Sequence, residues 1–142
     1  MTYKNNNKTE GNPLLEKYDT PHNAIPYDRI TLKDYIPAIK KAIRNEEKIV
    51  EEICNSNEVS TFDNTIAALD YSGVQLGNII GAFNAVANAS SNDEILAIEE
   101  EMQQLYVTHK NNITLNKKLF ERIKNVWKIK EYSGLYINLS EK

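Results

Sequence analysis

The chain has 142 residues, a formal net charge of -3, two histidines and one cysteine. This length is enough for one domain with a buried core, and the slightly negative charge argues against a surface for nucleic acid or anionic membranes. A single cysteine excludes an internal disulfide and any metal site built on a Cys-x-x-Cys pair.

Residues 1–11 are polar and rich in asparagine, which predicts a disordered tail. They contain no apolar run typical of a secretory signal. The sequence therefore predicts a cytoplasmic protein, or a periplasmic one if a signal was removed. Residues 12–30 carry three of the four prolines and several apolar side chains. Because proline biases the chain toward extended geometry, we expect an extended segment packed along a helical body.

The first predicted helix begins after Thr31, a plausible N-cap, and continues to about Asn55. Pro37 falls near its start, where a helix tolerates proline best. Glu46 interrupts the apolar stripe. The stripe consists of Tyr35, Ile39, Ala42, Ile43, Ile49, Val50 and Ile53.

The stretch from residue 63 to residue 90 predicts the central helix, capped by Thr61 or Asp63. It has no charged residue between Asp70 and Asp93, which is typical of a helix buried on several sides. Small residues recur every four positions and predict a groove that a neighbouring helix approaches closely. The predicted apolar face is Ile66, Leu69, Gly73, Leu76, Ile80, Phe83 and Ala87, and the small residues are Gly73, Gly77, Gly81, Ala85 and Ala89.

A membrane helix dimer is an alternative for this stretch, because Gly-x-x-x-Gly is a dimerisation motif in lipid. A spanning helix needs about 20 predominantly apolar residues. Gln75, Asn78, Asn84 and Asn88 interrupt the run, and no basic cluster flanks it. The pattern therefore favours a buried helix of a globular domain.

Two further helices are predicted, one starting at Asn92 and one at Asn116. The first should return antiparallel to the central helix because the loop before it is short. Ser133-Gly134 predicts the end of the second, and Ser140 resembles the cap of another helix that the sequence does not complete. Together these patterns predict an all-α fold: an antiparallel bundle of about four helices behind a proline-rich extended segment, forming an incomplete domain over residues 12–142.

Candidate chemical groups are few. His22 lies in the proline-rich segment and His109 on an apolar stripe, and neither has a histidine or cysteine three or four residues away. We interpret His109 as a hydrogen-bonded packing residue, Cys54 as a half-buried free thiol and the acidic run 99–101 as a solvated helix face. The sequence therefore predicts no catalytic, cofactor-binding or metal-binding residue in this chain.

Several sequence blocks resemble the N-terminal part of the family of zinc metallopeptidases that includes peptidyl-dipeptidase Dcp, oligopeptidase A and thimet oligopeptidase. They run in order from about Asn12 to the end of the chain and are specific in combination. The blocks are Asn12-Pro13-Leu14-Leu15, Tyr18-Asp19-Thr20-Pro21-His22, Ile25-Pro26-Tyr27-Asp28-Arg29-Ile30, Tyr35-Ile36-Pro37-Ala38, Thr61-Phe62-Asp63-Asn64-Thr65-Ile66, Leu69 with Ser72-Gly73, Asn92-Asp93-Glu94 and Asn116-Lys117-Lys118-Leu119-Phe120.

The resemblance implies a fragment of a longer helical protein in which these helices form a wall of a substrate channel. Family members bind zinc through a His-Glu-x-x-His helix, in which the glutamate activates water. This chain has no His-Glu-x-x-His motif. The resemblance therefore implies zinc and the hydrolysis of short peptides, with release of C-terminal dipeptides, for a full-length parent and no catalytic residue here.

Two functional hypotheses follow. In the first, the chain is the N-terminal helical part of such a peptidase, and its partners are the rest of the parent chain and the parent's peptide substrates. In the second, it is a free-standing helical interaction module without chemistry. Both hypotheses allow self-association of the isolated chain, because Val74, Ile79 and Val86 lie off the main face of the predicted central helix.

Overall fold

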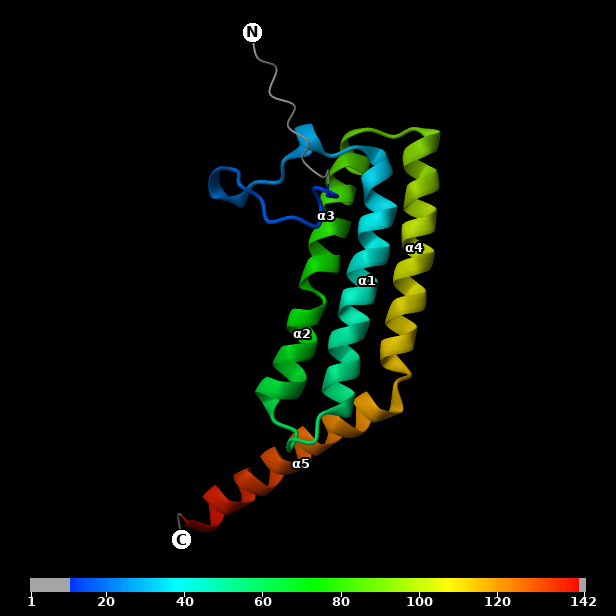
Figure 1. The fold of residues 1–142 in the computed structure, drawn as a ribbon. Helices are drawn as coiled ribbons and strands as arrows, with labels where there is room; N and C mark the ends of the chain where they lie inside the picture. Colours follow the sequence, from blue (N-terminus) through cyan, green and yellow to red (C-terminus); the bar gives the residue numbers. More distant parts are fainter. Residues whose placement is uncertain (1–10, 141–142) are drawn as a thin grey trace.

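The computed structural model describes residues 11–140, and these residues form helices and loops without a strand (Figure 1). Three rods lie side by side, and a fourth helix crosses below them. The rod that contains α3 runs antiparallel to α1 and α4, whereas α1 and α4 run in the same direction. Helix α1 spans Leu32–Asn55. The second rod joins the π-helical turn η3 (Phe62–Ala67), α2 (Ala68–Ser72) and α3 (Val74–Ala89). Helices α4 (Asp93–Thr114) and α5 (Lys117–Ser140) follow. The all-α prediction is confirmed.

Helix α1 is the centre of the bundle. It lies between α3 and α4 in Figure 1 and packs against α2, α3, α4 and α5. The prediction that residues 63–90 form the central helix is therefore wrong. That stretch carries fewer charges than α1, but its apolar side chains pack mainly in one direction, whereas α1 is covered by several neighbours. The main core gathers Leu14, Tyr35, Ala38, Ile39, Ala42, Leu76, Ile79, Ala82, Phe83, Ile95 and Met102.

Helix starts follow the predicted capping chemistry. The Thr31 backbone N–H donates to Asp34 Oδ2 at 2.7 Å. The Asn64 backbone N–H donates to Thr61 Oγ1 at 3.1 Å, and the Ile95 backbone N–H donates to Asn92 Oδ1 at 2.9 Å. Each contact satisfies a backbone group that the first helical turn leaves without a partner. Thr61 rather than Asp63 is thus the cap of the second rod.

The proline-rich segment packs along the bundle as predicted. Leu14 is buried in the main core, and the Asn12 side chain donates to the Asp34 backbone carbonyl of α1 at 2.7 Å. Two short 3-10 turns follow, η1 (Pro21–Asn23) and η2 (Tyr27–Arg29). The predicted disordered tail lies outside the described residues, except for the exposed Gly11.

The second rod breaks at Gly73, and its buried face differs from the prediction. Ile79 is fully buried, although the sequence places it off the main apolar face, and Ile80 is only partly buried. A methyl group added at Gly77 or Gly81 would meet no atom within 4 Å. The predicted close-packed groove is therefore open at these two positions, where an added methyl group has no neighbour.

Helix α5 is longer than predicted. It begins after Asn116, whose side chain accepts from the Leu119 backbone N–H at 3.1 Å, and it continues through Ser133 and Gly134 to Ser140. The expected helix end at Ser133-Gly134 is therefore wrong. A glycine inside a helix costs about 1 kcal/mol relative to alanine, which does not by itself end the helix. The residues after Ser140 lie outside the described part.

A membrane-spanning helix is not found among the described residues, since none of their helices is both long and apolar enough to cross a bilayer.

Candidate functional site

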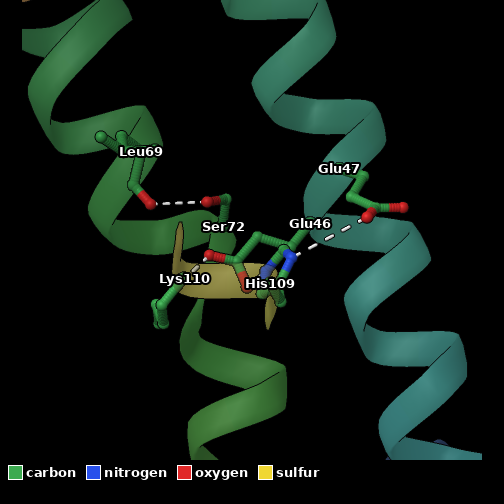
Figure 2. Close-up of polar contacts among 6 residues, drawn as sticks. All are labelled: Glu46, Glu47, Leu69, Ser72, His109 and Lys110. Atoms are coloured by element: carbon green, nitrogen blue, oxygen red, sulfur yellow. Dashed lines mark hydrogen bonds and ion pairs between the residues drawn. The ribbon is translucent and has the colours of Figure 1, made fainter. Parts of the chain in front are cut away.

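A buried acid–base pair joins α1 and α4. Glu46 stands where the sequence shows an interruption of the apolar stripe of α1, and His109 lies on the inner face of α4. Both residues are 2% exposed, and His109 Nε2 lies 2.8 Å from Glu46 Oε2 (Figure 2). The hydrogen-bonded role expected for His109 is confirmed, and its partner is Glu46, the residue that interrupts the apolar stripe of α1.

Three groups surround this pair. Lys110 Nζ lies 3.6 Å from Glu46 Oε1. A Cβ atom added at Gly73 would lie 3.2 Å from the same Oε1, so the break in the second rod coincides with the place where the carboxylate needs room. On the other side, Glu47 Oε1 lies 3.9 Å from His109 Nδ1, as Figure 2 shows.

His109 Nδ1 is buried and has no hydrogen-bond partner. His109 lines two cavities, one on each side of Glu47. The first, of about 300 Å³, lies between α1, α4 and the start of α5 and includes Glu51, Cys54 and Asn116 in its wall. The second, of about 450 Å³, lies between α1 and α4 and includes Glu101.

The pair does not form a hydrolytic triad in the described residues. Such a triad needs a hydroxyl or thiol nucleophile on one imidazole nitrogen and a carboxylate on the other. Glu46 occupies Nε2, while Nδ1 faces a second carboxylate. The nearby Ser72 hydroxyl instead donates to the Leu69 carbonyl at 2.5 Å (Figure 2). The geometry therefore serves packing and electrostatics rather than nucleophilic attack.

The structure separates most of the other predicted candidates. His22 is exposed in η1 with a left-handed backbone, φ 58°. Cys54 lines the 300 Å³ cavity with His109, a proximity that sequence spacing did not suggest, and its thiol contacts Asn116 Oδ1 at 3.8 Å. Burial raises the pKa of this thiol, and the Asn116 contact partly opposes the rise. Such a thiol is a poor nucleophile at neutral pH.

The acidic run on α4 is a solvent-exposed helix face, as predicted. Glu99, Glu100 and Glu101 are exposed, and Glu101 pairs with Lys40 of α1 at 3.1 Å. Among the described residues, no group of three His, Cys, Asp or Glu side chains is placed to hold a metal ion. The residues present therefore do not fit a zinc centre of three protein ligands.

A further cavity, of about 830 Å³, lies between the proline-rich segment, α1 and the second rod. Its walls combine apolar side chains with the amides of Asn45 and Gln75, which bond to each other at 2.9 Å. Tyr18 also lines it, and burial is the main cause that raises the pKa of the Tyr18 hydroxyl.

No family model matches the chain. Two curated relatives do. Over 124 residues, 87% of this chain, it is 34% identical to the dipeptidyl carboxypeptidase of Salmonella typhimurium. Over 127 residues, 89% of this chain, it is 32% identical to the dipeptidyl carboxypeptidase of Escherichia coli. The chain matches the N-terminal region of the Dcp family. It spans only 18% and 19% of these two relatives, so the Dcp-like region is a small part of each.

The buried role of Glu46 was not predicted from the sequence. A usable signal was present: Glu46 and His109 are both polar residues at positions that the helical period assigns to the core. A buried charge requires a partner of complementary chemistry, so a glutamate and a histidine at core positions of two helices are candidates to pair with each other.

Proposed function

We propose that this chain forms the N-terminal helical part of a larger peptidase with dipeptidyl carboxypeptidase activity. The observation that carries the proposal is the identity of 34% and 32% to two dipeptidyl carboxypeptidases over nearly the whole chain. In that larger protein the catalytic centre lies outside these 142 residues. Short peptides are the substrates of the whole protein, not of this part alone.

Zinc belongs to the proposed parent and not to this chain. In the family that the sequence resembles, a His-Glu-x-x-His helix supplies zinc ligands and the glutamate that activates water. The present sequence has two histidines, His22 and His109, and no such motif. His109 is engaged with Glu46 in the bundle core. A residue that holds two helices together in this way is a poor candidate for a metal ligand.

The role that suits the bundle is that of a wall beside the substrate channel. Helix α1 is braced by neighbours on several sides, so the bundle offers a stiff support. No atom lies within 4 Å of a Cβ added at Gly77 or Gly81 of α3, and these glycines line a cavity of about 360 Å³ with Tyr18 and Ile25 of the proline-rich segment. A row of small residues of this kind leaves room for another helix of the parent to approach. We propose that residues 12–142 act as one such supporting domain.

A non-catalytic interaction module is the second candidate. Phe120 and Trp127 of α5 are 59% and 61% exposed, and their seven-residue spacing puts them on one helix face. Exposed aromatic residues on one face are typical of a surface that another protein chain covers. This observation fits both candidates, and the isolated chain should self-associate under either.

Metal content and peptidase activity test the proposal. The purified 142-residue chain is expected to retain no stoichiometric zinc after dialysis and to release no dipeptide from a short peptide above background. A longer chain from the same coding region should contain zinc and release C-terminal dipeptides in a chelator-sensitive way. Chelator-sensitive release by the 142-residue chain would refute the assignment of catalysis to another part. A longer chain that folds but lacks activity and zinc would favour the interaction module.

A further inference from the structure

His109 Nδ1 and the Glu47 carboxylate lie 3.9 Å apart and share no hydrogen bond. Glu46 Oε2 accepts from His109 Nε2 at 2.8 Å, so Nε2 carries a proton. In neutral imidazole the other nitrogen is then an acceptor. This nitrogen, Nδ1, is buried without a partner and faces the Glu47 carboxylate, another acceptor, at 3.9 Å. Two acceptors thus face each other at a separation that one donor atom can bridge with two hydrogen bonds of about 2.8 Å.

We propose that this gap is a binding site for a primary ammonium group, of the kind that a lysine side chain carries. An ammonium nitrogen has three donors and can bond to Nδ1 and the Glu47 carboxylate at once. The inference concerns this chain alone and goes beyond the proposed function. It requires neither the larger peptidase nor its zinc.

The surroundings favour a cation over a neutral donor. Glu47 and Glu51 line the cavity of about 300 Å³ with a single basic residue, Lys118. Glu47 and Glu101 line the cavity of about 450 Å³, and Glu101 pairs with Lys40 at 3.1 Å from outside the cavity wall. Lys110, the nearest cation, is directed to the opposite carboxylate, Glu46, at 3.6 Å. A charge-assisted hydrogen bond to Glu47 is also about twice as strong as a neutral one.

Access to the gap is through Glu47. Its side chain is 51% exposed, whereas the His109 side chain is 1% exposed. Glu47 and His109 both line the two cavities, so an incoming group reaches Nδ1 by displacing the exposed Glu47 carboxylate.

Nuclear magnetic resonance of the two imidazole rings tests the site. The full chain is titrated with n-butylammonium at neutral pH, and the nitrogen shifts of His109 are followed, with His22 as the internal reference in an exposed turn. We expect a saturable shift at His109 Nδ1 and none at His22. Tetramethylammonium, which has charge but no N–H donor, should leave His109 unchanged.

Variants separate binding from general charge effects. Glu47→Gln should weaken binding of n-butylammonium about tenfold, since it removes a hydrogen bond to a charged group. Glu52→Gln, an exposed change on the same helix outside both cavities, should leave the affinity unchanged. Circular dichroism of both variants verifies that the fold is intact.

Three results would overturn the proposal. The first is a His109 ring that carries protons on both nitrogens at neutral pH in the absence of ligand, because it would then donate to Glu47 directly. The second is an equal response to tetramethylammonium. The third is an unshifted Nδ1 at saturating n-butylammonium, which would leave water as the occupant of the gap.

Discussion

Gly73 and Gly81 belong to the same row of small residues and have opposite surroundings. A Cβ atom at Gly73 would lie 3.2 Å from the carboxylate of Glu46, whereas a Cβ atom at Gly81 would meet nothing within 4 Å. The inner position makes room for a buried charge, and the outer one leaves an open face. Glycines spaced along one rod can therefore have different roles: Gly73 leaves space for a buried carboxylate, and Gly81 leaves an open helix face.

The largest loss of stability is expected from Glu46→Ala, which removes the buried carboxylate beside Gly73. It leaves His109 without its partner inside the bundle, and loss of one member of a buried pair costs about 3–5 kcal/mol. Urea unfolding should show a fall of this size in the free energy of unfolding. The matched control is the double variant Glu46→Leu with His109→Leu, which removes both polar groups. We expect it to recover part of the loss, and a double variant no more stable than Glu46→Ala would argue against a pairwise interaction.

Gly73→Ala should destabilise the bundle by about 1–3 kcal/mol, the usual cost of overpacking. The carboxylate that the new methyl group meets is buried and held by His109 and Lys110, so it cannot yield easily. The gain in helix propensity is about 0.5–1 kcal/mol and does not offset this cost. Thermal and urea unfolding measure the change. A Gly73→Ala chain as stable as the parent would show that the space beside Glu46 is not limiting.

Gly81→Ala should change the free energy of unfolding in the opposite direction to Gly73→Ala. With no atom near the added methyl group, the variant should be more stable by about 0.5–1 kcal/mol because alanine favours the helix. Gly77→Ala should behave alike. The same substitutions made in a longer chain from the same coding region would sharpen the comparison. Destabilisation there, with stabilisation in the 142-residue chain, would mean that another helix covers the outer face.

The smallest effect is expected at Cys54, which lines the cavity of about 300 Å³ between α1, α4 and the start of α5. Burial raises its pKa above that of an unfolded thiol. A raised thiol pKa stabilises the folded state fully below the unfolded value, and this contribution is lost as the pH rises through the folded value. Iodoacetamide should therefore react more slowly with Cys54 in the folded chain than in urea, and Cys54→Ser should show a weaker loss of stability at alkaline pH. Equal alkylation rates in both states would contradict the expected burial.

The helix starts show how much of the fold local chemistry specifies. Thr31, Asn92 and Asn116 were predicted as starts from residue type and following pattern, and each precedes a helix in the structure. Capping depends on contacts within about three residues, so the sequence contains the necessary information. The end of α5 was not predictable in this way, because a glycine only weakens a helix and does not determine whether it continues.

The sequence by itself determined the all-α class, the caps, the packed proline-rich segment and the relation to the Dcp family, because each depends on periodicity, neighbouring residues or residue identity. The tertiary structure alone decided that α1 is central, that Glu46 pairs with His109 across 63 positions, and that Gly73 is confined while Gly77 and Gly81 are open. The physical reason is that a helical stripe shows which face is apolar, not which helix will cover it. Burial of a charged group depends on a partner brought close only by the folded chain.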